Sequence, residues 1–366
     1  MRILYFGTYS RDYIRNRVII KGLKKNNVEV IECHYPLWKG VEPRIQEFKG
    51  IKGLIKLAFN FLKSYIILFL KSFDIVEKPD FIIVGYTGHF DIPLAFIISR
   101  FFRRKLVFDM FVSLYDTFVL DRKLVKNFLL KRLLRFIDRW SMILSDKVLL
   151  DTDTHIEYLS KEFNIDKGKF IRVWIGEDPE IFYPIGIEKN KFNVLYFGGY
   201  IPLHGVEFIV DAARELKDID FTFIGRGQLY NDILKYSKGL KNIKFIDWMD
   251  LKELKYYISS ASVSLGIFGN TDKAKRVIPN KIYEAIACKT PVLTSDTPAI
   301  REVFKHRENI YLCKIADADS IKNGILELKN SKKLREKIAE NSHRLFLEKF
   351  TPEKIGKELL IELKRL

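Results

Sequence analysis

The chain alternates short apolar runs with longer amphipathic stretches, and this series restarts halfway along its 366 residues. The apolar runs are rich in Val, Ile, Leu and Phe without strict alternation, which is typical of parallel strands covered on both faces. The first series predicts strands at residues 2–6, 28–33, 81–85, 105–109, 147–150 and 170–174. It predicts helices at residues 12–25, 50–72, 91–102, 123–144 and 154–163. Such alternation indicates a doubly wound α/β sheet.

The second series follows a proline-bearing linker that begins at Gly176. It predicts strands at residues 192–197, 220–224, 243–246, 262–267, 291–294 and 310–313. It predicts helices at residues 205–216, 228–238, 250–259, 279–288, 319–330 and 332–348. Thr351 and Pro352 then provide the N-cap and first turn of a last helix.

We therefore predict two Rossmann-like domains, at residues 1–175 and 191–348, joined by a linker at 176–190. The last helix, within residues 349–366, is expected to cross back to the first domain. Parallel α/β sheets bind ligands outside the carboxyl ends of their strands. Two such sheets would present those ends to a shared cleft.

Basic residues outnumber acidic ones by 63 to 46, which gives a net charge of +17. Residues 1–175 hold 31 basic and 19 acidic residues, so most of the excess, +12, belongs to the first domain. A basic surface attracts nucleic acid, acidic lipids or phosphorylated substrates, and the alternative is a soluble basic protein with nothing bound there. Because no nucleic-acid motif is present, we expect no nucleic-acid partner.

The cysteines Cys33, Cys288 and Cys313 are too few and too far apart for a disulfide framework or a zinc site. They fit a reducing compartment. The sequence shows no secretory signal pattern and no apolar run of about 18 residues. We therefore expect a cytoplasmic protein without a transmembrane helix.

A glycine-bearing segment, Gly198-Gly199 to His204-Gly205, follows the first strand of the second series and opens a helix. Glycines at this place let backbone N–H groups approach a phosphate, and the helix N-terminus adds partial positive charge. An ordinary strand-to-helix turn is the alternative. The segment lacks the dinucleotide fingerprint of glycines, which argues against an NAD enzyme.

A second motif places Lys281 in the first turn of a helix begun by Pro279, with Glu284 one turn later. A cation in the first turn of a helix is repelled by the helix dipole. Its position is better explained if an anion binds at the helix N-terminus. Glu284 is placed to accept hydrogen bonds from a ribose diol. A solvated Lys–Glu pair is the alternative.

In order and spacing, these residues resemble the donor domain of the retaining glycosyltransferases of family 4, which share the two-domain GT-B fold. The resemblance spans residues 192–366 and includes Gly198 to Gly205, residues 224–227, Pro279 to Pro291 and residues 350–352. It is weaker in the first domain, at residues 6–10 and 85–91. It implies a transferase that moves a sugar from a nucleotide-diphosphate sugar to a glycan or lipid-linked acceptor, in polysaccharide or glycolipid biosynthesis.

The sequence departs from the family at its cationic clamp and its acidic pair. Gly199 and His204 stand where the family usually has arginine and lysine. Glu284 keeps the second position of the acidic pair, but the first falls on Arg276, so Asp272 is the candidate for contacting the donor sugar. The candidates for stabilising the leaving diphosphate are His204, Arg226, Arg276 and Lys281.

The resemblance implies retention of anomeric configuration, with the diphosphate taking the proton of the acceptor, so no pair of catalytic carboxylates is expected. Donors placed in advance would stabilise the leaving charge. In the first domain, Gly7 is a further candidate for the donor phosphate, and the acceptor-side candidates are Thr8, Tyr9 and Ser10. His89 and Asp109 are the candidate catalytic residues, each with a structural role as the alternative.

The sequence Asp151-Thr-Asp153 looks like the metal-binding motif of the other glycosyltransferase architecture, GT-A. It lies where a strand gives way to a helix, so helix capping is the simpler interpretation. We therefore expect no required metal or other cofactor, and activity that survives a chelator.

Five lysines fall on one face of the helix predicted at residues 50–72: Lys49, Lys52, Lys56, Lys63 and Lys71. Aromatic and aliphatic side chains surround them, as in surfaces that lie on anionic lipids. The hypothesis is a peripheral membrane enzyme, and the alternative is a core-packed helix with a solvated face. Two other functions stay open: a nucleotide-sugar epimerase or phosphorylase, and a carbohydrate or nucleic-acid binding protein without catalysis.

Overall fold

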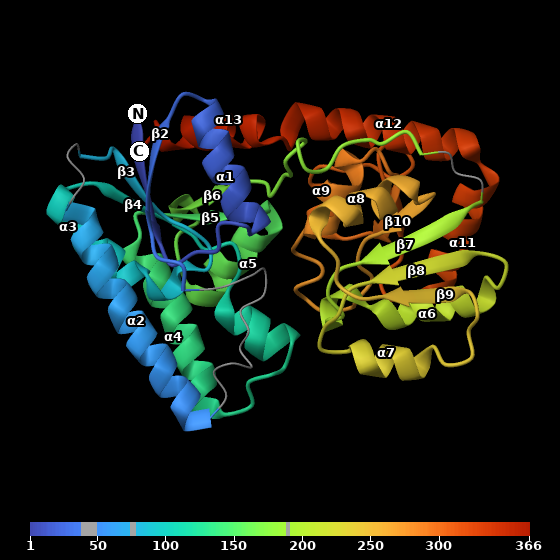
Figure 1. The fold of residues 1–366 in the computed structure, drawn as a ribbon, viewed down its shortest axis with the longest axis horizontal. Coiled ribbons are helices and arrows are strands. Elements are labelled where there is room, and N and C mark those ends of the chain that lie inside the picture. Colours follow the sequence, from blue (N-terminus) through green and yellow to red (C-terminus); the bar gives the residue numbers. More distant parts are fainter. Residues whose placement is uncertain (38–49, 74–77, 188–190) are drawn as a thin grey trace.

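The computed structural model describes residues 1–37, 50–73, 78–187 and 191–366, and it contains two parallel six-stranded sheets, each flanked by helices (Figure 1). The first sheet has the order β2-β1-β3-β4-β5-β6. Its strands are β1 (Arg2–Gly7), β2 (Glu29–His34), β3 (Phe81–Val84), β4 (Lys105–Asp109), β5 (Lys147–Leu150) and β6 (Phe170–Arg172). Its helices are α1 (Ile14–Lys25), α2 (Gly50–Phe73), α3 (Ile92–Phe102), α4 (Phe128–Leu144) and α5 (Asp153–Phe163).

The second sheet has the order β12-β11-β10-β7-β8-β9. Its strands are β7 (Asn193–Phe197), β8 (Asp220–Ile224), β9 (Ile243–Ile246), β10 (Val263–Leu265), β11 (Val292–Ser295) and β12 (Tyr311–Cys313). Its helices are α6 (Val206–Glu215), α7 (Tyr230–Tyr236), α8 (Leu251–Ser260), α9 (Asn280–Ala287), α10 (Pro298–Arg301), α11 (Ala318–Asn330) and α12 (Lys332–Lys349). The predicted doubly wound class is confirmed for both domains.

Both sheets are buried on two faces, as the unbroken apolar runs predict. Ile3, Leu4, Tyr5 and Phe6 of β1 are all fully buried. Residues of β1 are shared between two hydrophobic clusters, one on each face of the sheet. One of these clusters continues into the second domain through Trp174, Phe182, Tyr283 and Phe350.

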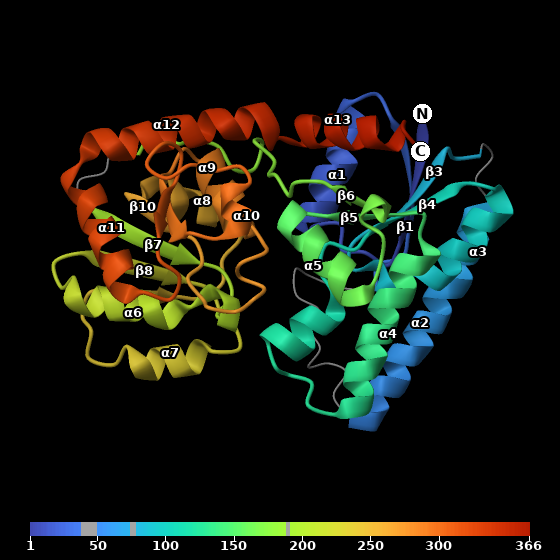
Figure 2. The ribbon, with the colours of Figure 1, turned by 180° about the vertical axis from the view of Figure 1, so that it is seen from behind.

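The last helix, α13 (Pro352–Leu363), leaves the second domain and packs against α1 of the first (Figures 1 and 2). Glycines allow a very close helix crossing: a Cβ atom added at Gly22 would lie 2.1 Å from the carbonyl oxygen of Pro352. One added at Gly356 would lie 2.2 Å from the carbonyl carbon of Gly22. The two domains are therefore joined by the linker and by this returning helix.

Two local features differ from the sequence prediction. The helix predicted at residues 123–144 begins only at Phe128, because Asn127 caps it by accepting a hydrogen bond from the Leu130 amide. Before it, residues Asp116–Asp121 form a π-helical turn, η3. The short helix α10, capped by Thr297, was not predicted. η3 lies at the contact between the domains, as described below.

Candidate functional site

The glycine-bearing segment leaves the end of β7 and turns through a short 3-10 helix, η5 (Pro202–His204), into α6. Gly205 has φ +59°, and a Cβ atom there would lie 2.4 Å from the backbone nitrogen of Gly269. A side chain at position 205 would therefore collide with the chain that follows β10. Gly198 and Gly199 lie at the start of the same turn, beside His204.

His204 is held inside this turn. Its Nδ1 atom lies 2.9 Å from the Tyr196 hydroxyl and also contacts the Gly199 carbonyl oxygen. Burial and the neighbouring Lys281 ammonium hold the pKa of His204 well below its usual range. In this structure His204 therefore shapes the turn, and its role in stabilising a diphosphate stays a prediction.

Lys281 lies in the first turn of α9, with its amine directed at the glycine turn. Its Nζ atom is 3.5 Å from His204 Nδ1 and 4.0 Å from the centre of the Tyr196 ring. Burial lowers the pKa of Lys281 to about 7, and Glu284 opposes this shift. In the described part of the chain, no carboxylate oxygen lies within 4.0 Å of the Lys281 amine.

Glu284 follows one turn later on α9 and belongs to an acidic cluster. Burial and the nearby Glu177 carboxylate raise the pKa of Glu284 to about 8. Glu177 comes from the linker, is fully buried, and accepts a hydrogen bond of 2.5 Å from Arg17 of α1. Linker, α1 and α9 thus meet at this point. The sequence contained no signal for Arg17 or Glu177.

The three acceptor-side candidates follow β1, but two of them face into the first domain. The amide of Thr8 donates to Asp91 Oδ2 at 2.8 Å, and its hydroxyl donates to the same carboxylate. The Tyr9 hydroxyl donates to Glu32 at 3.0 Å. The side chains of Thr8 and Tyr9 are therefore buried and bonded within the first domain, whereas Ser10 is partly exposed, and their acceptor-side role stays a prediction. Gly7, with φ +125°, precedes them and packs against Asp91.

His89 lies in the short 3-10 helix η2 (Gly88–Phe90) that follows β3, and is only 2% exposed. Its Nε2 atom is 3.2 Å from Asp138 of α4, and its ring packs edge-on against Phe108. The same Asp138 accepts hydrogen bonds from Ser113 and the Tyr115 amide. His89 is therefore buried between η2, β4 and α4, although neither of its ring nitrogens makes a hydrogen bond within the described residues.

Asp109 ends β4 and is completely buried. Arg15 of α1 donates to both of its carboxylate oxygens at 3.0 Å. The same guanidinium donates to the carbonyl oxygens of Val173 and Trp174. Although burial raises the pKa of Asp109, Arg15 lowers it in part. Asp109 therefore forms a buried ion pair that joins α1, β4 and the segment after β6, which is the structural alternative named for it, and its catalytic role stays a prediction.

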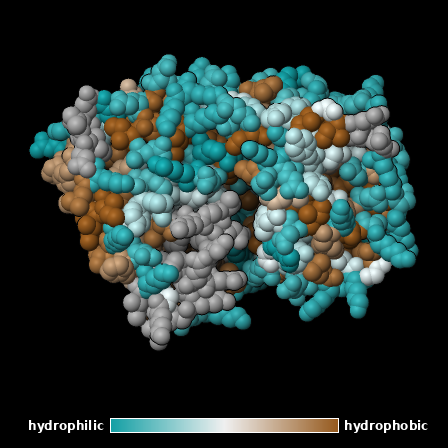
Figure 3. All heavy atoms as spheres, viewed as in Figure 1, coloured by the Kyte–Doolittle hydropathy of each residue, from teal (hydrophilic) through white to brown (hydrophobic). Residues whose placement is uncertain are grey.

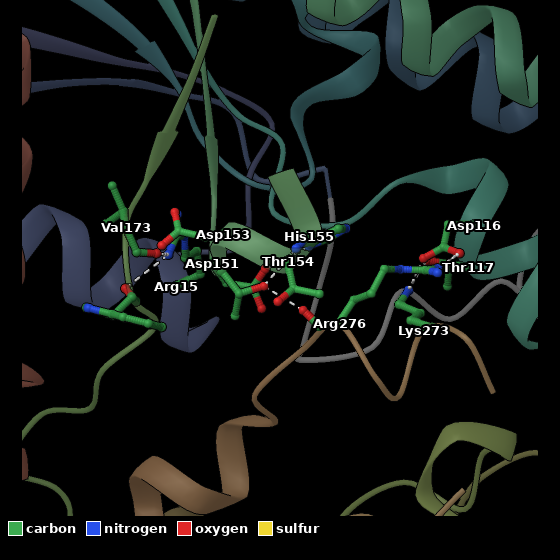
Figure 4. Close-up of polar contacts among 12 residues, drawn as sticks. Arg15, Asp116, Thr117, Asp151, Asp153, Thr154, His155, Val173, Lys273 and Arg276 are labelled. Atoms are coloured by element: carbon green, nitrogen blue, oxygen red, sulfur yellow. Dashed lines mark hydrogen bonds and ion pairs between the residues drawn. The ribbon is translucent and has the colours of Figure 1, made fainter. Parts of the chain in front are cut away.

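Arg276 spans the gap between the domains (Figure 4). Its guanidinium donates to Asp116 of η3 at 2.7 Å and stacks 3.5 Å from the centre of the Tyr158 ring. Beside it, the Lys273 amine donates to Thr117 at 2.5 Å. The first domain therefore occupies the Arg276 side chain in this structure, and its contact to a diphosphate stays a prediction.

Arg226 and Asp272 form exposed ion pairs. Arg226 binds Asp247 through two hydrogen bonds of 2.9 and 2.7 Å, and Asp272 pairs with Lys275 at 3.2 Å. Arg226 adjoins the glycine turn through its backbone, since its carbonyl oxygen accepts from the Tyr200 amide. Each side chain is therefore engaged by an oppositely charged partner at the surface, and its contact to a donor stays a prediction.

The Asp151-Thr-Asp153 sequence caps α5, as predicted. Thr152 accepts a hydrogen bond from the His155 amide, and Asp151 binds the His155 ring at 2.7 Å. Glu302 of the second domain accepts from the Asp153 and Thr154 amides. Within residues 1–37, 50–73, 78–187 and 191–366, no three His, Cys, Asp or Glu side chains are grouped as metal ligands.

The site that remains is formed by the glycine turn, the N-terminus of α9, Lys281 and Glu284. A hollow between the two domains is visible in the space-filling view (Figure 3). Residues 177–345 match the family model described as Glycosyl transferases group 1. The match covers most of the C-terminal domain.

Similar proteins match the chain over both domains. An uncharacterised glycosyltransferase of Methanocaldococcus jannaschii is 24% identical over 328 residues, covering 85% of this chain and 80% of the relative. The chitobiosyldiphosphodolichol beta-mannosyltransferase of Debaryomyces hansenii is 25% identical, covering 65% of this chain and 56% of the relative.

The solved structure of Anabaena HepE in complex with UDP-glucose has a TM-score of 0.69 with 15% identity, and each chain is covered completely. At this identity the likeness shows the fold. The predicted GT-B fold and the resemblance to glycosyltransferases are therefore confirmed.

Proposed function

We propose that the protein is a retaining glycosyltransferase of family 4 that uses a nucleotide-diphosphate sugar as donor. The observation that carries this proposal is the buried amine of Lys281 at the glycine turn. A cation without a carboxylate partner, placed at a helix N-terminus, is stabilised by an anionic ligand. The UDP-glucose bound to HepE supports a nucleotide sugar as that ligand.

In this proposal the Lys281 ammonium and the partial positive charge at the N-terminus of α9 stabilise the charge that develops on the leaving diphosphate. Glu284 binds the ribose diol. The acceptor hydroxyl attacks the anomeric carbon from the face that the diphosphate leaves, and its proton passes to the diphosphate. No metal is required in these steps.

The acceptor is proposed to be a glycan or a lipid-linked glycan. The name of the Debaryomyces relative, which specifies a dolichol-linked diphosphate, supports the lipid-linked class. Epimerisation of the donor without an acceptor is the competing activity, and incubation with donor alone distinguishes the two. The basic first domain favours a separate acceptor that is anionic.

The proposal is tested by thermal denaturation in the presence of UDP, GDP and ADP and their sugars. A ligand at 100 times its dissociation constant adds about 2.7 kcal/mol to the free energy of unfolding, so one nucleotide should raise the Tm clearly above the others. Donor hydrolysis or transfer is then measured with and without a chelator, and activity should survive. If no nucleotide shifts the Tm, the proposal fails.

Nucleotide affinity should fall as the pH rises above about 7. The pKa of Lys281 is about 7 in the free protein, so the amine is mostly neutral at higher pH, whereas a bound diphosphate favours the ammonium. Binding then takes up one proton, and affinity should fall by up to about tenfold per pH unit until the pKa of the complex is reached. Calorimetry at pH 8 in two buffers of different ionisation enthalpy measures this uptake. Lys281→Met should abolish it, and a flat profile in the unaltered protein would contradict this assignment.

A further inference from the structure

Large apolar side chains are exposed in unusual number on the outer helices of the first domain. On α2 the exposed side chains are those of Phe59, Leu62, Ile66, Phe69, Leu70 and Phe73. At about 100° per residue these six positions fall within an arc of about 100°. Lys56 and Lys63 lie along one edge of that arc, and both are exposed. Lys49 and the side chain of Lys52 lie outside the described residues.

Helix α4 repeats this pattern, which the sequence analysis did not identify. Leu129, Leu133, Phe136 and Trp140 are 43–72% exposed and fall within an arc of about 60° at about 100° per residue. Arg132 and Arg139, also exposed, lie along one edge of the arc. The opposite side of α4 is buried against the domain, where Asp138 and Met142 are located.

The helices form one outer layer, because α3 packs against both α2 and α4. Phe73 of α2 contacts Phe101 of α3 with ring centres 5.0 Å apart, and Phe101 is 64% exposed. In the space-filling view, hydrophobic atoms gather over α2 and α3 (Figure 3). Contiguous exposed apolar patches mark binding surfaces. We call the exposed sides of α2, α3 and α4 the outer helical face.

The charge of this face is of one sign. Residues 50–73 contain four lysines, and residues 92–105 contain four basic residues; neither segment contains an acidic residue. In α4 the one acidic residue is Asp138, which is completely buried and bound by Ser113 and two backbone amides. Apolar stripes edged by cations are complementary to anionic lipid headgroups above acyl chains. A second copy of the same cationic face would be repelled.

We propose that the outer helical face seats the protein on an anionic lipid bilayer, with the apolar stripes of α2 and α4 inserted among the headgroups. No described helix has the length and apolarity needed to cross a bilayer, so this contact is peripheral.

The face is also continuous with the contact between the domains. Asp116 and Thr117 of η3 bind Arg276 and Lys273, and Leu124, a few residues later, is exposed next to the start of α4. A lipid-linked acceptor would therefore enter the gap between the domains directly from the bilayer. This last step rests on the proposed function.

The test is flotation of the full chain with vesicles of phosphatidylcholine alone or with about a third phosphatidylglycerol. The protein should float with the anionic vesicles and much less with the neutral ones, and added salt should weaken binding. Leu129→Ser/Phe136→Ser should lower the partition coefficient by about 100-fold, since each inserted side chain contributes about tenfold. The matched control is Leu347→Ser/Ile361→Ser, two comparably exposed positions on α12 and α13, which should bind as the unaltered protein does.

Circular dichroism first establishes that both variants are folded. Absence of binding to anionic vesicles, or an equal loss in both variants, overturns the proposal. A concentration-dependent dimer in light scattering that only the α4 variant loses would assign the face to a second copy of the chain, and would also overturn it. Because flotation needs neither donor nor turnover, its outcome is independent of the test of catalysis.

Discussion

Replacing Lys281 with alanine is expected to lower the rate of sugar transfer by about 10²–10³-fold. Removal of one pre-positioned donor from a site that stabilises developing negative charge has an effect of this size, about 2.7–4 kcal/mol. The amine of Lys281 is only 3.5 Å from His204 Nδ1 inside the glycine turn. Neighbouring cations have carboxylate partners: Arg226 is bound by Asp247, and Arg276 by Asp116. We therefore expect no neighbouring cation to take over the role of the Lys281 amine.

The measurement is steady-state kinetics with the nucleotide sugar that gives the largest thermal shift. Lys289→Ala is the matched control, because Lys289 follows the other end of α9 and pairs on the surface with Glu340. It should keep the full rate. Equal rates for Lys281→Ala and Lys289→Ala, with both proteins folded, would remove Lys281 from the site.

Replacing Arg15 with alanine is expected to lower the free energy of unfolding by about 3–5 kcal/mol. Both members of the Arg15–Asp109 pair are completely buried, and removal of one member leaves an uncompensated charge in the interior. The guanidinium also satisfies the carbonyl oxygens of Val173 and Trp174, which would lose their donor. Urea denaturation followed by tryptophan fluorescence measures the change.

Two further variants test whether Asp109 has only a structural role or also a role in catalysis. Arg15→Met/Asp109→Leu should recover much of the stability, since it leaves no unpaired buried charge. Arg365→Ala, which breaks an exposed pair with Glu362, should change stability by less than about 1 kcal/mol. If the double variant is stable but inactive, Asp109 has a role in catalysis beyond the ion pair.

The elements and their order could be predicted because each depends on local pattern. β4 and β5 have the bounds predicted from their apolar runs alone. The placement of Lys281 and Glu284 on one helix could also be predicted, since both lie within the first turns after Pro279. The capping role of Thr152 followed from its position between a strand and a helix.

Roles that depend on distant partners could not be predicted. Asp109 and Arg15 are 94 positions apart, and Arg276 and Asp116 are 160 apart. A lone polar residue after a strand has the same local pattern whether it faces a ligand or a buried partner, and Thr8 and His89 are examples. For α4, periodicity defines an apolar side but does not show that it remains uncovered.

The return of α13 to the first domain has a consequence for biosynthesis. Ile355, Leu359 and Leu363 of α13 are fully buried, and the crossing with α1 is made by Gly22, near the beginning of the chain, and Gly356, near its end. During translation, the side of α1 that α13 covers stays exposed until residues 352–363 have been made. The amino-terminal half is therefore not an autonomous folding unit. Neither half can be exchanged between relatives unless its part of the contact between α1 and α13 is exchanged with it.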